Sequence, residues 1–175
     1  PGFVISYLKR ILHQEEINSF LKENKHKKNQ EFCDEVMKYF NIKVQVNDIH
    51  HIPKEGPVIL IMNHPLGGMD GIAFISGVMN HRPDIKFIVN DLLMNVENLK
   101  DLFVGVNKHG KNNVSVRNQI KNAFDADHAL CIFPAGLVSR KAEGKVRDLE
   151  WKKTFVTYAR ALDRQVVPIF IDGKL

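Results

Sequence analysis

The first 41 residues carry apolar side chains at helical spacing. Val4, Leu8, Ile11 and Leu12 form one stripe at intervals of four, three and one residues. Two further stripes lie on either side of a polar break at 22–29, and consist of Ile17, Phe20 and Leu21, and of Phe32, Cys33, Val36, Met37 and Phe40. The pattern predicts an amino-terminal segment of amphipathic helices over 1–41. Such helices usually pack on a core, but they can also lie flat on a bilayer.

From residue 42 onward, short apolar or β-branched runs alternate with helical stretches. The predicted strands are Ile42–Val46, Val58–Met62, Ile85–Val89, Phe103–Val106, Ala129–Phe133 and Val166–Ile171. The predicted helices are Gly71–Asn80, Leu92–Leu102, Val114–Phe124 and Leu149–Leu162. This alternation predicts an α/β fold over 42–175, with a largely parallel central sheet flanked by helices.

In such a sheet, sites lie in the loops at the carboxyl ends of the strands. The loop after Val58–Met62 holds His64 and Asp70 around the pair Gly67-Gly68. Imidazole suits proton abstraction near neutral pH, a carboxylate on its other nitrogen fixes its tautomer, and glycines let backbone N–H groups approach an oxyanion. An isolated His and Asp are more often structural, with the Asp as a helix cap.

Two other loops on the predicted rim carry positive charge. Lys108 follows the strand Phe103–Val106. The loop after Ala129–Phe133 contains Gly136 in a turn and then Ser139, Arg140 and Lys141, which supply hydrogen-bond donors and cations for an anion. Each loop is weak evidence alone, but together the three place a base and several cations on one rim.

Composition adds the class of protein. The 175 residues are 44% hydrophobic and 26% charged, which is typical of a single globular unit and excludes a disordered or disulfide-scaffold chain. No apolar run approaches the roughly 18–20 residues of a membrane span. The two cysteines are far apart in sequence, which fits a reducing cytosol. A chain that begins at Pro1 without a signal pattern and stops after a strand-like run indicates trimming, including at the carboxyl end.

The positive charge is concentrated in one stretch. Residues 100–164 contain 13 Lys and Arg against 7 Asp and Glu, a net +6, whereas the whole chain is +5. This bias points to an anionic partner, such as phosphate, an acyl-carrier protein, lipid headgroups or nucleic acid, although a solvated lysine-rich face explains it equally well. Neither an aromatic RNA-binding pattern nor an arginine stripe supports nucleic acid.

Other site chemistries lack their motifs. The sequence has no Gly-x-Ser-x-Gly elbow for a nucleophilic serine and no Walker phosphate loop. A zinc site built from His50, His51 and His64 is disfavoured, because adjacent histidines on a strand would face opposite ways. No metal is expected.

Four segments resemble the ordered blocks of the glycerolipid and lysophospholipid (PlsC-like) acyltransferase superfamily. They are His64 to Asp70, Gly105–Lys108, Ile132–Gly136 and Val167–Ile169, and their order covers the chain from about residue 42 to its end. The sequence Asn-His-Pro-Leu-Gly-Gly-Met-Asp-Gly is most similar to a bacterial branch labelled hemolysin, which we treat as a naming habit, or to O-acyltransferases of amino-acid-containing lipids.

The chain departs from the family pattern in three places. The His-to-Asp gap is one residue longer than the family's His-x4-Asp, Lys108 replaces a common arginine, and Ala135 replaces the glutamate of the third block, whose basic residue arrives later as Arg140. These differences keep the base and the turn, but they do not support carrying over the usual glycerol-phosphate acceptor.

The resemblance implies an O-acyltransferase of membrane lipid synthesis. His64, oriented by Asp70, would activate a hydroxyl of a lyso-lipid acceptor, and the acyl group would come from an acyl-carrier protein or coenzyme A thioester as co-substrate, with no bound cofactor. The protein would lie at the cytoplasmic face of the cell membrane in peripheral contact with it. The rivals are a non-catalytic α/β module that binds an anionic ligand or acidic protein and, less favoured, a nucleic-acid-binding domain.

Overall fold

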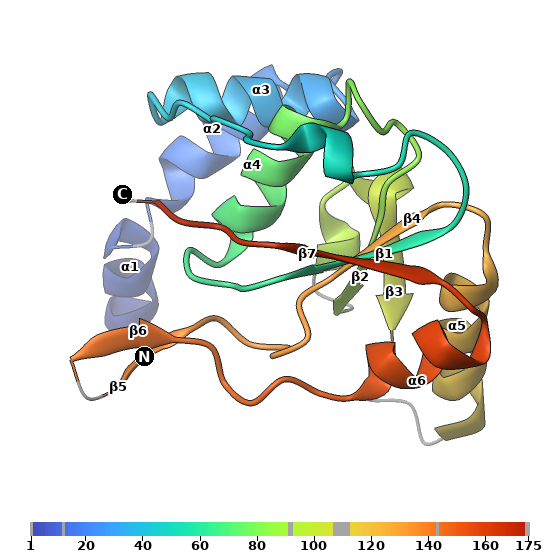
Figure 1. Ribbon diagram of the computed structural model, residues 1–175. Coiled ribbons are helices and arrows are strands. Elements are labelled where there is room, and N and C mark those ends of the chain that lie inside the picture. The colour runs from blue at the N-terminus through green and yellow to red at the C-terminus, as the bar shows by residue number, and fades with distance from the viewer. Residues whose placement is uncertain (1, 12, 91–92, 107–112, 143, 174–175) are drawn as a thin grey trace.

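A five-stranded parallel sheet forms the centre of the protein, in the order β3-β2-β4-β1-β7 (Figure 1). Its strands are β1 (Val58–Met62), β2 (Lys86–Asn90), β3 (Phe103–Val106), β4 (Ala129–Ile132) and β7 (Gln165–Ile169). The computed structural model describes residues 2–11, 13–90, 93–106, 113–142 and 144–173. Helices cover both faces of the sheet, which confirms the predicted α/β fold.

Alternate side chains of β1 enter two apolar cores, one on each face of the sheet. Leu60 and Met62 pack beneath α3 (Asn29–Tyr39) and α4 (Gly68–Val78). Ile59 and Ile61 pack towards α5 (Asn113–Asp125) and α6 (Thr154–Ala161) on the opposite face (Figure 1). Burial on both faces explains the uninterrupted apolar sequence of this strand.

The amino-terminal helices differ in how much they bury. The helix α3 contributes four side chains to the core, namely Phe32, Cys33, Val36 and Met37. By contrast, α2 (Gln14–Glu23) buries no residue, and α1 (Gly2–Ile11) exposes Phe3 and Tyr7. Within the described residues, no helix combines the length and apolar character that crossing a membrane requires.

Two sequence-based elements are wrong. Residues 42–46 pair with no described strand, because Val44 and Val46 instead pack over Gly77 of α4, where a Cβ would approach them within 3.0 and 2.7 Å. The helix expected over Leu92–Leu102 consists, in its described part, of two tight 3-10 turns, Leu93–Asn95 and Lys100–Leu102. Between them the buried side chain of Asn98 donates to the carbonyls of Asn24 and Lys27.

The segment between β4 and α6 contains an antiparallel hairpin that the sequence pattern did not predict. It consists of β5 (Arg140–Ala142) and β6 (Lys145–Arg147) and projects from one end of the molecule (Figure 1). The following helix begins only at Thr154 rather than at Leu149. The backbone before it is held elsewhere, since the Lys152 N–H donates to the Pro134 carbonyl.

Candidate active site

His64 and Asp70 meet at the carboxyl end of β1. The Nδ1–H of His64 donates to Oδ2 of Asp70 over 2.9 Å. The carboxylate is fully buried, whereas the imidazole keeps 17% of its side-chain surface exposed. With the proton on Nδ1 facing the acid, Nε2 carries the lone pair, so the pair is arranged as a base with its orienting carboxylate.

The start of α4 fixes the position of Asp70. Its backbone N–H donates to the carbonyl of Gly67, and its Oδ2 also accepts the Leu66 N–H over 3.0 Å. Gly67 has φ 68° and ψ −133°, a backbone conformation that residues other than glycine rarely adopt. The glycine therefore lets the loop turn sharply from His64 into the helix. The other oxygen, Oδ1, is buried with no hydrogen-bond partner among the described residues.

The imidazole rests against an aromatic side chain. The ring of Phe133 stacks on His64 with centroids 4.1 Å apart and planes inclined by 22°. Phe133 follows β4, the strand next to β1, so strand pairing brings the two loops together. Leu66 and Met69, beside the pair, are partly exposed. The base therefore lies at the edge of an apolar region that opens to solvent.

Backbone donors near the base come from one of the two predicted glycine turns. Among the described residues, nothing accepts a hydrogen bond from the N–H of Gly68 or Met69, which are donors left free in the first turn of α4. The N–H of Gly136, by contrast, donates to the Phe133 carbonyl over 2.9 Å and closes its own turn. The start of α4 is therefore better placed than Gly136 to offer donors to an oxyanion.

Asp148, which the sequence did not single out, fastens the base loop to the segment after β4. Its Oδ1 accepts the backbone N–H of His64 over 3.1 Å and the hydroxyl of Ser139, and its Oδ2 accepts the Trp151 indole N–H over 2.8 Å. Burial alone would raise the pKa of the Asp148 carboxyl, but the hydrogen bonds from Ser139, His64 and Trp151 outweigh it and lower that pKa below its ordinary value of 3.8.

We expect Asp148→Asn to lower the free energy of unfolding by about 1.5 kcal/mol, or roughly 3–6 °C in Tm, because the amide nitrogen cannot accept a hydrogen bond. A carboxyl whose pKa is lowered in the folded state stabilises the fold above its ordinary pKa, and that contribution is lost as the pH falls below it. The difference between wild type and variant should therefore shrink between neutral pH and about pH 3.

Thermal melts over this pH range measure the effect, and Asp127→Asn, which removes an exposed carboxylate, is the matched control. If Asp148→Asn had the same Tm as the control at neutral pH, Asp148 would not stabilise the contact between the His64 loop and the segment after β4.

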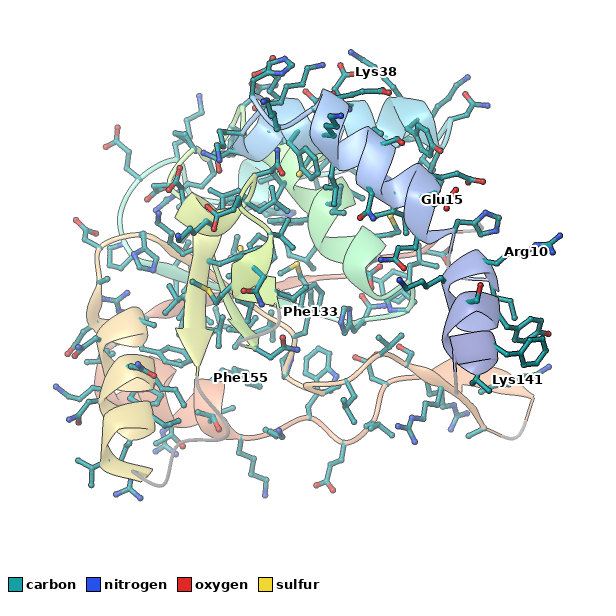
Figure 2. All side chains as sticks on the ribbon, turned by 180° about the vertical axis from the view of Figure 1, so that it is seen from behind. Arg10, Glu15, Lys38, Phe133, Lys141 and Phe155 are labelled. Carbon is teal, nitrogen blue, oxygen red and sulfur yellow. The ribbon has the colours of Figure 1, made fainter. Side chains whose placement is uncertain are left out.

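The predicted cations are less closely grouped than the base and acid. Arg140 and Lys141 lie on the exposed strand β5, and Figure 2 shows Lys141 far from Phe133. Ser139 is nearer, since its N–H donates to the His64 carbonyl over 2.8 Å, but its hydroxyl is engaged by Asp148. Lys108 lies outside the described residues.

Other nucleophiles and metal ligands find little support. Burial raises the pKa of Cys33 to about 12 and also raises that of Cys131 well above its ordinary value, so neither thiol supplies a thiolate. His50 and His51 lie in a 3-10 turn (Ile49–His51) with ring centroids 4.3 Å apart, so the strand geometry used to argue against zinc was wrong. The described residues nevertheless contain no group of three or more side chains able to hold a metal ion.

Several residues at the site were not assigned a role from sequence. Phe133 was quoted only as part of a motif, and Asp148 and Trp151 were not singled out. Lys152 was also missed, although its ammonium lies so close to Gly136 that a Cβ there would be 3.2 Å from Nζ. Asp148 lies 84 positions from His64, so no spacing rule connects the two.

Comparison with known proteins decides the family, because the Acyltransferase family model matches residues 1–175. The chain belongs to this acyltransferase family. It is 44% identical over 176 residues to a lyso-glycine lipid O-acyltransferase of Bacteroides thetaiotaomicron, covering 99% of this chain and 64% of that protein. It is 40% identical to a lyso-glycine lipid O-acyltransferase of Phocaeicola vulgatus, covering 99% of this chain and 63% of that protein.

The chain thus spans just under two thirds of the length of the curated relatives that it matches. No solved structure was found to match it. The family assignment confirms the resemblance drawn from the four sequence blocks. The catalytic and binding roles given to individual residues stay predictions.

Proposed function

We propose that this chain transfers a fatty acyl group from a thioester to the hydroxyl of a lyso-lipid, with His64 as the general base. The observation that carries the proposal is the 2.9 Å contact between Nδ1 of His64 and the fully buried carboxylate of Asp70. That contact leaves Nε2 as the basic atom of an imidazole whose side chain is 17% exposed. Membership of the acyltransferase family supports the reaction class.

The reaction needs no covalent enzyme intermediate. Nε2 of His64 removes the proton of the acceptor hydroxyl while the acceptor oxygen attacks the thioester carbonyl carbon. The oxyanion that forms accepts hydrogen bonds from the backbone N–H groups of Gly68 and Met69 in the first turn of α4. The C–S bond then breaks, and the departing thiolate accepts from the imidazolium the proton that the acceptor hydroxyl gave up. The products are an ester and a free thiol.

The relatives suggest the acceptor, since both are named for a lyso-glycine lipid. A lyso-lipid with an amino-acid headgroup agrees with the departures from the glycerol-phosphate pattern at Ala135 and Arg140. We further propose that Lys108, Arg140 and Lys141 meet the anionic groups of the substrates or of the membrane. The donor is an acyl-carrier protein or coenzyme A thioester, and the protein works at the cytoplasmic face of the cell membrane.

Mass spectrometry of the ester product tests the proposal. The protein is incubated with labelled acyl-carrier protein or acyl-coenzyme A and with lyso-glycine lipid, lysophosphatidic acid or glycerol phosphate. We expect transfer to lyso-glycine lipid to exceed transfer to glycerol phosphate. If the protein bound these donors or acceptors but transferred no acyl group to any acceptor from either donor, the non-catalytic binding module would be favoured instead.

A further inference from the structure

The β5–β6 hairpin has no apolar core of its own. All six strand residues are exposed, and no described strand pairs with either outer edge. A two-stranded ribbon exposed on both faces is at best marginally stable in water. Its base, however, is fixed to the candidate active site, because the Ser139 N–H donates to the His64 carbonyl and Asp148 accepts from both Ser139 and His64.

The hairpin places like charges opposite one another. Arg140 pairs directly with Arg147, and Ala142 with Lys145, so three cationic side chains share one face of the ribbon. Like charges directly across a pair of strands destabilise it unless an anion lies between them. None of the three forms a hydrogen bond or ion pair in the described part of the chain, and Asp148 is already occupied by three donors. The charge pattern calls for an external anionic partner.

Aliphatic side chains accompany these cations. Val146 is 62% exposed on the opposite face of the ribbon, beside Lys141, and the approach to the hairpin exposes Leu137 and Val138. The helix α1 lies at the same end of the molecule as the hairpin in both views (Figures 1 and 2), and Figure 2 places Arg10 of α1 and Lys141 of β5 at that end. Exposed apolar and basic side chains thus come from two segments far apart in the sequence.

This mixture favours a lipid surface over an acidic protein. Basic side chains bind anionic headgroups. Exposed aliphatic side chains stabilise binding when they leave water and enter the boundary between the headgroups and the acyl chains. We propose that the β5–β6 hairpin and its approach, residues 137–142 and 144–147, dock this protein on an anionic phospholipid bilayer. The inference deepens the proposed function, on which it rests, because the base of the hairpin holds the backbone of His64 and so seats the catalytic pair at the membrane surface.

The test uses flotation of the protein with vesicles of phosphatidylcholine, with and without phosphatidylglycerol. Wild type should bind the anionic vesicles and release them in high salt. Lys145→Gln/Arg147→Gln should weaken binding about 30-fold, because each basic residue near an anionic surface contributes roughly fivefold. Val146→Ser should also weaken binding, but without changing how steeply binding falls as salt is added, because it removes apolar contact only.

Arg117→Gln/Arg160→Gln is the matched control. It removes the same charge from exposed positions on α5 and α6, at the other end of the molecule (Figure 1), and should bind as wild type does. His64→Ala should likewise bind vesicles fully while transferring acyl groups about 10²–10⁴-fold less efficiently, so loss of catalysis and loss of docking are separable.

Equal loss of binding by the two charge variants would overturn the proposal, since general charge would then suffice. Failure of the wild-type protein to bind anionic vesicles would also overturn the proposal, whether or not the protein transfers acyl groups to dispersed lyso-lipid. A hairpin variant that keeps vesicle binding but loses binding to an acyl-carrier protein would assign the surface to that acidic partner instead.

Discussion

Replacement of His64 by alanine is expected to lower kcat/KM for acyl transfer by about 10²–10⁴-fold, the usual contribution of a general base. Its loss should also cost the fold about 1 kcal/mol of stacking on Phe133 and roughly 1.5–3 kcal/mol for the hydrogen bond to the buried Asp70 carboxylate. Initial rates of ester formation with a fixed lyso-lipid and thioester, compared at equal folded protein, measure the effect.

The matched control is His26→Ala, which removes an exposed imidazole from the turn between α2 and α3. It should transfer acyl groups at the wild-type rate. If His64→Ala retained activity within about tenfold of wild type, a base outside this loop would have to be sought.

Asp70→Asn should lower kcat/KM by about 10²–10³-fold with little change in Tm. The amide oxygen can replace Oδ2 and still accept from Leu66 N–H and His64 Nδ1–H, so the loop geometry survives. What disappears is the negative charge that stabilises the imidazolium formed as the acceptor loses its proton. The separation of these two effects distinguishes an electrostatic role from a structural one.

A thermal melt alongside the rate measurement provides that distinction. A loss of activity that parallels a large fall in Tm would mean that Asp70 mainly caps α4, the structural role that its position also permits. Wild-type kcat/KM in a stable Asp70→Asn variant would remove the acid from the proposed mechanism.

The sequence predicted those features that depend on local patterns. A continuous apolar run identified β1 within its observed bounds, because a strand buried on both faces needs apolar side chains at every position. The contact between His64 and Asp70 was also expected, since a short glycine loop leads from that strand into the first turn of a helix. Neither expectation required knowledge of distant contacts.

Features set by distant contacts were not predicted. Residues 42–46 have the β-branched composition of a strand, but Val44 and Val46 pack against α4 in the space that the missing side chain of Gly77 leaves. The hairpin has no alternating apolar pattern, and only the pair Glu143-Gly144 between two basic runs resembles a two-residue turn. The role of Asp148 depends on donors from three separate segments, so its own neighbours in sequence carry no sign of it.

The aromatic contacts behind His64 have a consequence for the direction of substrate approach. Phe133 stacks on the imidazole and lies 6.2 Å from Phe87, which in turn meets Phe74 edge-on at 6.1 Å. This column of rings runs from the imidazole into the core and, with the carboxylate hydrogen bond, holds the imidazole in its orientation. The acceptor hydroxyl must therefore approach Nε2 in the plane of the imidazole, where the lone pair lies, along the edge of a ring whose face is covered by Phe133.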